Sequence, residues 1–239
     1  MNPEFDFEKR FRLIREIVET IVLTLLMFLV IRFAIQNFNV DGTSMEPNLH
    51  DKELILVDKW TYLFHPPVRG DVIVFIAPPQ PSMDYVKRVI GLPGDVITIK
   101  GTTVIVDGAT LNETYIASQN QGVPFGARTI TNLVVPAGDY FVLGDNRKVS
   151  SDSRVWGFVP KANIIGRAAF VYWPWGEDNN GFLKNYTSVY ANVHQANSAM
   201  VGHPANAPGM LGVESFVLLL VPGFSFAFLL KRQRQQREE

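Results

Sequence analysis

Cysteine is absent from this chain of 239 residues, and its absence excludes several kinds of chemistry at once. Without thiols the chain has no disulfide bond, no thiolate metal site and no cysteine nucleophile. Histidine is scarce as well, and its four copies lie far apart, at His50, His65, His194 and His203. Because they lack the spacing of metal ligands, we expect isolated surface histidines and no metal site.

An excess of positive charge is also missing. The 22 Lys and Arg residues nearly balance 23 Asp and Glu residues, for a formal net charge of -1. Nucleic acid usually requires a basic face on its partner, so we expect no nucleic-acid binding. The length and the 47% hydrophobic content allow one sizeable domain with additional segments.

A long hydrophobic run lies near the N-terminus. From residue 20 to residue 40 the only charged residue is Arg32, and roughly 20 helical residues cover about 30 Å, the thickness of a hydrocarbon core. A cleaved secretory signal is the alternative, but the run is longer than the apolar part of such a signal and lacks a small-x-small site. We predict a cytoplasmic segment over 1–16 and an uncleaved transmembrane anchor over 17–38.

A second apolar run lies near the C-terminus, where we predict another transmembrane helix over 214–230 and a basic cytoplasmic tail over 231–239. Pro222 and Gly223 weaken the case for a helix, and a buried terminal hairpin is the alternative. Lys and Arg residues precede the first span and follow the second. This pattern places both termini in the cytoplasm and the intervening chain on the outer side of the plasma membrane.

Between the two spans, short apolar or alternating runs recur among Gly and Pro residues. They are "LILVDK", "DVIVFIAPP", "YVKRVIG", "DVITIKG", "TVIVDG", "LVVPAGDYFVLGD" and "IGRAAFVYW". Such runs are typical of strands, and no sustained helical period occurs among them. We predict a mainly β, antiparallel extracytoplasmic domain over 39–175. Residues 176–213, rich in asparagine, are predicted to form a polar linker, with a short surface helix as the alternative.

One turn carries a candidate nucleophile. In "DGTSMEPNLHD", residues 41–51, Gly42 and Pro47 punctuate a turn that exposes Ser44. Most serines in turns are merely solvated or bind their own backbone, so a catalytic serine needs a base. Histidine is poorly placed and cysteine is missing. A lysine with a lowered pKa therefore remains as the base.

Lys87, in "DYVKRVIGLPGD", is the best-placed lysine. On a strand it shares one face with Tyr85 and Val89, whose bulk can remove water from its amine and lower its pKa. A surface lysine that extends its charge into water is the alternative. A third stretch, "VLGDNRKVSSDSRVWGFVP" over 142–160, is dense in hydroxyls and charges, which suits either a solvated loop or a support for the other two stretches.

Four stretches in this order, "GTSMEPNL", "RGDVIVF", "YVKRVIGLPGDVI" and "VLGDNRKVSSDSRVWGFVP", resemble the sequence boxes of bacterial type I signal peptidases, also called leader peptidases. The resemblance covers roughly residues 17–175. It implies a membrane-bound serine endopeptidase that removes signal peptides from secreted precursors by cutting after small residues. Four ordered motifs make chance similarity improbable.

The same resemblance implies roles for individual residues. Ser44 is the nucleophile, Lys87 is the general base, and Ser150 falls where a hydroxyl binds the lysine amine. Structural ion pairs join Asp145 to Arg88 and Asp152 to Arg154. Met45 and Val86 belong to the substrate groove. All these roles are analogies of position.

The chain departs from some members of the family at Gly42, where they have a serine whose hydroxyl stabilises the oxyanion. The backbone N–H of Ser44 remains as one donor. The second donor is left open among the Thr43 hydroxyl, another backbone N–H and water.

The expected partners are secretory precursors and the lipid bilayer, and we expect a monomer that uses no cofactor.

One competing interpretation is a self-cleaving transcriptional repressor, which would need a DNA-binding domain where this chain has an anchor. Another is a membrane-anchored β adaptor without activity. The presence of both Ser44 and Lys87 in matching boxes disfavours the adaptor.

Overall fold

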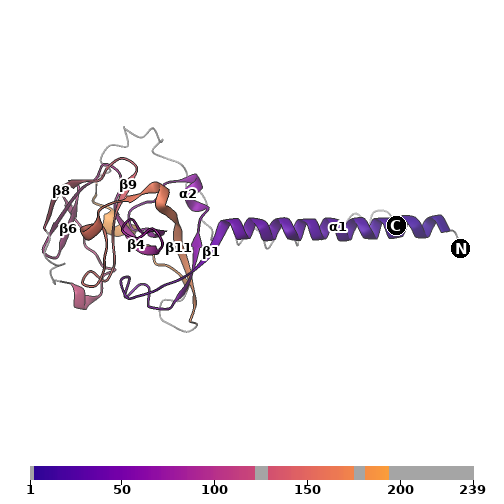
Figure 1. Cartoon of the computed structure of the whole chain (residues 1–239), viewed down its shortest axis with the longest axis horizontal. Coiled ribbons are helices and arrows are strands. Elements are labelled where there is room, and N and C mark those ends of the chain that lie inside the picture. The colour runs from indigo at the N-terminus through magenta and orange to yellow at the C-terminus, as the bar shows by residue number, and fades with distance from the viewer. Residues whose placement is uncertain (1–2, 122–128, 175–180, 194–239) are drawn as a thin grey trace.

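The computed structural model describes residues 3–121, 129–174 and 181–193, in which a long N-terminal helix projects from a β domain (Figure 1). Helix α1 comprises Pro3–Ala34. Within its stretch Arg10–Ala34, a window of 18 residues has a mean hydropathy of 2.3, and none of that window is buried. An apolar helix that is exposed on all sides is long enough and apolar enough to cross a membrane.

The helix ends four residues before the predicted end of the anchor, because the chain becomes a strand at Ile35. Strand β1, Ile35–Asn39, pairs with β2, Leu54–Asp58. The N–H of Lys59 continues this ladder by donating to the carbonyl of Ala34 at 2.9 Å, one of the carbonyls that a helix end leaves unsatisfied. Helix α1 therefore runs directly into the sheet.

The remaining elements are mostly short strands. After β2 come α2 (Thr61–Phe64), β3 (Val72–Ile76), β4 (Asp84–Gly91), β5 (Val96–Lys100), β6 (Thr103–Val106), β7 (Ala109–Thr110) and η1 (Ser118–Asn120). They are followed by β8 (Ile130–Val134), β9 (Asp139–Leu143), α3 (Ser153–Trp156), β10 (Val159–Pro160), η2 (Lys161–Asn163), β11 (Ile164–Trp173), β12 (Gly181–Phe182) and η3 (Thr187–Tyr190). Each of the seven quoted runs contains at least one strand.

The strands form two antiparallel sheets. The larger has the order β1-β2-β11-β3-β4-β9-β10, with β12 also paired to β11, and the smaller has the order β7-β6-β5-β8. The predicted mainly β, antiparallel fold with an N-terminal apolar helix is confirmed. Strand β4 lies inside the larger sheet between β3 and β9, and its residues 87–91 are buried.

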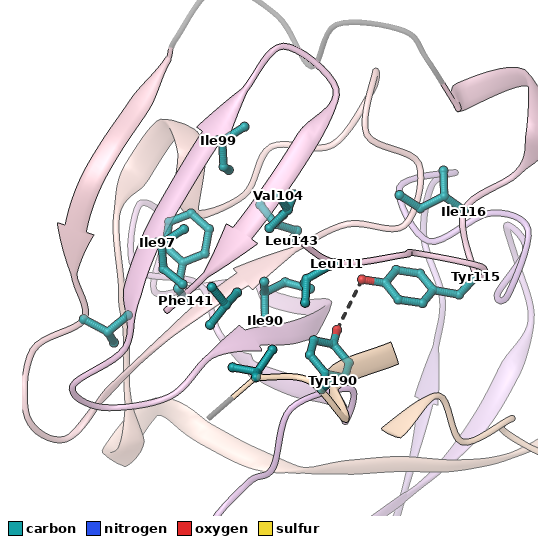
Figure 2. Close-up of a cluster of buried hydrophobic side chains, with 13 residues drawn as sticks. Ile90, Ile97, Ile99, Val104, Leu111, Tyr115, Ile116, Phe141, Leu143 and Tyr190 are labelled. Carbon is teal, nitrogen blue, oxygen red and sulfur yellow. Dashed lines mark hydrogen bonds between the residues drawn. The ribbon is translucent and has the colours of Figure 1, made fainter. Parts of the chain in front are cut away.

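The largest buried cluster lies where the smaller sheet packs against β4 and β9 (Figure 2). Its members come from both sheets and also from the segment after residue 180. They are Ile90, Ile97, Ile99, Val104, Val106, Leu111, Tyr115, Ile116, Val135, Phe141, Leu143, Tyr190 and Val193. Burial of this apolar surface holds the sheets together, and it holds β4 in a fixed position.

The structure corrects one part of the predicted domain organisation. Residues 181–193, which the sequence places in a polar linker, belong to the folded domain: β12 extends the larger sheet, and Tyr190 and Val193 are buried in its core. In the sequence, single aromatic residues separated by asparagines and other polar residues gave no strand or helix pattern that would predict this burial. The predicted helix over 214–230 and the tail over 231–239 lie outside the described residues.

Candidate active site

Ser44 lies in a tight turn whose ends are fixed by the core. Within the turn, the N–H of Glu46 donates to the carbonyl of Thr43 at 3.3 Å and the N–H of Leu49 to that of Met45 at 3.1 Å. The Met45 and Leu49 side chains are buried with β2 and β11 residues. Ser44 lies between the exposed Thr43 and the buried Met45 and is itself half-buried.

Lys87 reaches Ser44 from the middle of β4. Its Nζ lies 2.7 Å from Ser44 Oγ and donates to the carbonyl of Val86 at 2.8 Å. The side chain is only 5% exposed, and its Nζ lies 5.5 Å from the centre of the Tyr85 ring. The structure thus brings together the two residues that were predicted to react.

The surroundings of Lys87 favour a neutral amine. Burial lowers the pKa of Lys87 from 10.5 to about 8, whereas the negative charges of Asp152 and Asp145 act in the opposite direction. The burial effect is larger, so a substantial fraction of the amine is unprotonated near pH 8. The alternative of a solvated surface lysine is excluded by its burial.

Arg88, the next residue of β4, points to the opposite face and forms a buried ion pair. Its Nε and Nη2 donate to the two carboxylate oxygens of Asp145 at 2.8 and 2.6 Å, and its Nη1 donates to the carbonyl of Gly70 at 2.8 Å. Both partners are almost fully buried. The predicted pairing of Arg88 with Asp145 is present, and it connects β4 to the loop after β9.

That loop, residues 144–154, is held by the second predicted pair. Arg154 Nε donates to Asp152 Oδ1 at 2.7 Å, and Asp152 Oδ2 accepts the N–H of Gly144 at 3.0 Å. Arg154 also donates to the carbonyl of Arg147 at 2.8 Å. The guanidinium of Arg147 in turn makes two bonds to Glu113 at 2.6 and 2.7 Å. The dense polar stretch is therefore a buried network rather than a solvated loop.

Ser150 differs from the expectation drawn from the family. Its Oγ is buried and has no hydrogen-bond partner among the residues that the structure describes, so the expected bond to the Lys87 amine is absent. The amine bonds to Ser44 and to the Val86 carbonyl instead. Ser150 nevertheless lies beside the nucleophile turn, because both approach the same side of Gly144.

A groove of about 400 Å³ opens over the pair. Ser44, Lys87, Val86, Gly42 and Thr43 line it, together with Phe38, Asn39, Val40, Asp41, Ile55, Val74, Met83, Asp84, Tyr85, Val149 and Ser151. The prediction for Val86 agrees with this lining. The prediction for Met45 is wrong, because its side chain is 1% exposed and packs into the core below the turn.

Gly42 enters the turn with a φ of +94°, a region that glycine adopts without strain. Its N–H donates to Asp51 Oδ1 at 2.6 Å and is therefore already engaged. The Ser44 N–H and the exposed Thr43 side chain lie on the groove. The second oxyanion donor is left open among the Thr43 hydroxyl, a different backbone N–H and water.

Two asparagines that were not singled out in the sequence fix the nucleophile turn. Asn146 donates from its backbone N–H to the carbonyl of Ser44 at 3.0 Å and from its side chain to the carbonyl of Thr43 at 3.1 Å. Asn48 Nδ2 donates to Asp145 Oδ2 at 2.8 Å and to the carbonyl of Tyr115 at 2.9 Å. Both asparagines lie inside the quoted motifs, and nothing else in the sequence indicated that they support the site.

Gly144 is required by close packing. A Cβ atom at this position would lie 2.2 Å from Ser150 Oγ and 2.6 Å from the carbonyl oxygen of Ser44. Contacts this short are not tolerated, so only glycine allows the turn and the loop to meet here.

Among the described residues, no group of three or more His, Asp or Glu side chains is arranged to hold a metal ion.

Comparison with known proteins agrees with this geometry. The sequence profile of peptidase S26, described as signal peptidase, matches residues 13–173. The chain belongs to the signal peptidase family. Members of this family cleave signal peptides from secreted precursors, and the expected enzyme class is confirmed.

The relatives cover most of the chain. A signal peptidase I from Leptolyngbya laminosa is 40% identical over 165 residues, which are 66% of this chain and 78% of the relative. A probable signal peptidase I-1 from Synechocystis is 36% identical over 191 residues (75% and 92%), and signal peptidase IB from Staphylococcus aureus is 35% identical over 182 residues (71% and 94%). A crystal structure of a signal peptidase I from Enterococcus faecalis V583 aligns with 38% identity and a TM-score of 0.38, over 42% of this chain and 95% of that one.

Gly144→Ala tests the close packing. The added methyl group displaces the Ser44 carbonyl or Ser150, and a displacement on the order of 1 Å at a reacting group can lower the rate about 100-fold. We expect kcat on a soluble signal-peptide substrate to fall by at least tenfold at a temperature well below unfolding.

Gly166→Ala in β11 is the matched control, because its Cβ would lie 2.5 Å from the Asp58 carbonyl, away from the site. It should lower the melting temperature with little effect on kcat. Equal kcat losses in the two variants would show that Gly144 acts only through stability.

Proposed function

We propose that Ser44 and Lys87 form the catalytic dyad with which this signal peptidase hydrolyses its substrates. The observation that carries the proposal is the 2.7 Å contact between Ser44 Oγ and a buried Lys87 Nζ with a lowered pKa. A neutral amine at this distance is positioned to accept the serine proton. Among the described residues, Lys87 is the hydrogen-bond partner of the Ser44 hydroxyl.

The reaction follows from these two groups. Lys87 takes the proton of Ser44, and Ser44 Oγ attacks the scissile carbonyl carbon. The oxyanion accepts a hydrogen bond from the Ser44 N–H. When the C–N bond breaks, the Lys87 ammonium protonates the leaving amine, and an ester to Ser44 remains. Lys87 then takes a proton from a water molecule as the water oxygen attacks the ester carbonyl. When the C–O bond to Ser44 breaks, the Lys87 ammonium returns this proton to Ser44 Oγ, and the product leaves with a new carboxyl group.

The groove suits an extended substrate chain that the enzyme cuts after small residues. Its walls include the end of edge strand β1 and residues 84–87 of β4, which pair with β3 on one side only, and a peptide backbone can pair with such strand edges. The apolar residues Phe38, Val40, Ile55 and Val86 line this groove together with Ser44. Small pockets of this kind accept alanine-sized side chains, and larger ones would overlap with the walls. No cofactor enters these steps.

Cleavage of a signal-bearing precursor tests the dyad directly. Detergent-solubilised wild-type protein is expected to cut after a small-x-small site, as determined by sequencing the new N-terminus of the product. Ser44→Ala and Lys87→Ala are each expected to abolish cutting, by at least 10³-fold. Cutting that survives Lys87→Ala would overturn the lysine-base mechanism, and a wild-type protein with no activity in any lipid or at any pH would favour the adaptor.

The pH dependence of kcat/KM tests the state of Lys87. The base must be neutral, and the lowered pKa means that this form appears as pH rises through about 8 instead of 10.5. We expect kcat/KM to increase about tenfold per pH unit below that value and to level off above it. The measurement runs from pH 6 to pH 9.5 with circular dichroism as a control for folding. A profile without this rise would contradict the assignment.

We further propose that the catalytic domain lies outside the plasma membrane and rests on it, with both termini in the cytoplasm. The Lys and Arg residues around α1 support this orientation. Helix α2 lies at the end of the domain from which α1 projects, and β8 lies at the far end (Figure 1). Leu63 and Phe64 of α2 are 75% and 65% exposed, which suits them to contact with lipid.

Cysteine labelling tests this arrangement in a chain that has no cysteine of its own. Val134→Cys, in β8, is expected to react with a membrane-impermeant maleimide added to intact cells. Leu63→Cys is more exposed within the protein but should react only after detergent is added, because the bilayer covers it. Val134→Cys that reacts only in broken cells would reverse the orientation, and equal labelling of both would remove the lipid contact.

A further inference from the structure

The segment Gly181–Val193, here called the clasp, follows the region that matches the family profile, which ends at residue 173. Its first strand, β12, pairs with β11 through Phe182 opposite Phe170, and the N–H of Leu183 donates to the carbonyl of Ala169 at 3.0 Å. From there the clasp reaches the side of β4 that carries Arg88. The sequence assigned no role in catalysis to this segment.

The end of the clasp is anchored in the core by Tyr190. Its side chain is buried in the cluster of Figure 2, and its hydroxyl lies 3.2 Å from the Tyr115 hydroxyl. The ring packs so closely on Gly70 that a Cβ there would lie 3.2 Å from it. Gly70 is also the residue whose carbonyl accepts a bond from Arg88. The clasp therefore has a fixed position relative to the ion pair.

The middle of the clasp covers the ion pair with Tyr186. The Arg88 guanidinium lies 4.4 Å from the Tyr115 ring centre and 5.2 Å from the Tyr186 ring centre, and the two rings are 5.5 Å apart. These contacts combine cation–π attraction with exclusion of water. They protect the buried Arg88–Asp145 pair, whose residue Arg88 directly follows the proposed base in β4.

A second connection runs from Tyr186 to the nucleophile turn. The Tyr186 hydroxyl donates to Asn48 Oδ1 at 3.0 Å, while Asn48 Nδ2 donates to Asp145 Oδ2 and to the Tyr115 carbonyl. The bond to Oδ1 fixes which end of the amide faces Asp145. The backbone N–H of Asn48 donates to the carbonyl of Met45 at 3.0 Å, inside the turn that carries Ser44. One tyrosine thus contacts the supports of both proposed catalytic residues.

We propose that the clasp is a positioning element for catalysis, in which Tyr186 orients Asn48 and thereby holds the Ser44 turn against Lys87. The inference rests on the proposed Ser44–Lys87 dyad and extends it. Tyr186 contacts Arg88 and Asn48 and is not among the residues that line the groove, so it acts through Asn48 and not by touching substrate. It belongs to a segment that a sequence comparison limited to residues 13–173 does not include.

Tyr186→Phe removes the hydroxyl and keeps the ring over Arg88. With a soluble peptide substrate and full-length protein, we expect kcat to fall about fivefold, the effect of one hydrogen bond of about 1 kcal/mol, with KM within about twofold of the wild type. The control is Tyr62→Phe, which removes a hydroxyl bonded to Asp71 Oδ2 at 2.9 Å elsewhere in the domain. It should leave kcat unchanged, whatever its effect on the melting temperature.

A second measurement repeats Tyr186→Phe in an Asn48→Ala background. If Tyr186 acts through Asn48, its effect on kcat should shrink to less than about twofold there, because the acceptor of its hydroxyl is gone. A fivefold effect that persists in this background would overturn the proposed route. A Tyr186→Phe protein with wild-type kcat would overturn the positioning role, whether or not its melting temperature falls.

These outcomes are separate from a failure of the dyad itself. If Ser44→Ala retained activity, the proposed nucleophile would be wrong and Tyr186 would have no dyad to position. If Ser44→Ala is inactive and Tyr186→Phe equals the wild type, the dyad stands and the clasp is only a structural cover.

Discussion

The rest of the site depends on one costly constraint, the burial of the Lys87 amine. A charged ammonium is destabilised when water is removed, so burial drives the amine toward its neutral form. That neutral form is useful only if a hydroxyl lies within hydrogen-bond distance, which Ser44 provides at 2.7 Å. A lysine on an exposed strand would keep its proton at neutral pH. The position of β4 inside the sheet is therefore what makes the pair chemically competent.

The two carboxylates near Lys87 work against its neutral form, and the structure limits their effect with two arginines. Asp145 and Asp152 both favour the ammonium, yet each is neutralised by a buried partner, Arg88 and Arg154. An unpaired carboxylate in a medium of low dielectric constant would raise the pKa of the lysine more strongly. The Arg88–Asp145 pair thus joins β4 to the loop after β9, and both ion pairs keep negative charge from stabilising the protonated base.

Much of this arrangement could be predicted from the sequence, because it depends on local patterns. Alternation in "YVKRVIG" placed Lys87 and Arg88 on opposite faces of a strand. The family resemblance carried by the four ordered motifs implied the roles of Ser44 and Lys87 and both ion pairs. Long-range packing could not be predicted in the same way. Met45 adjoins the nucleophile in sequence, yet the turn directs it into the core. Nor did any pattern indicate that Gly144 is the point where the Ser44 and Ser150 segments meet.

The division of β4 into two faces explains why a remote segment can influence the site. The Lys87 amine meets Ser44 at the groove, where substrate must enter and leave, so no permanent cover can close over the pair there. The Arg88 face has no such demand and can be packed tightly by Tyr115 and Tyr186. Because strand geometry couples the two faces rigidly, precision gained on the covered side is transmitted to the open side. In a sheet enzyme whose base must face an open groove, support from behind the strand is the route that leaves the substrate path free.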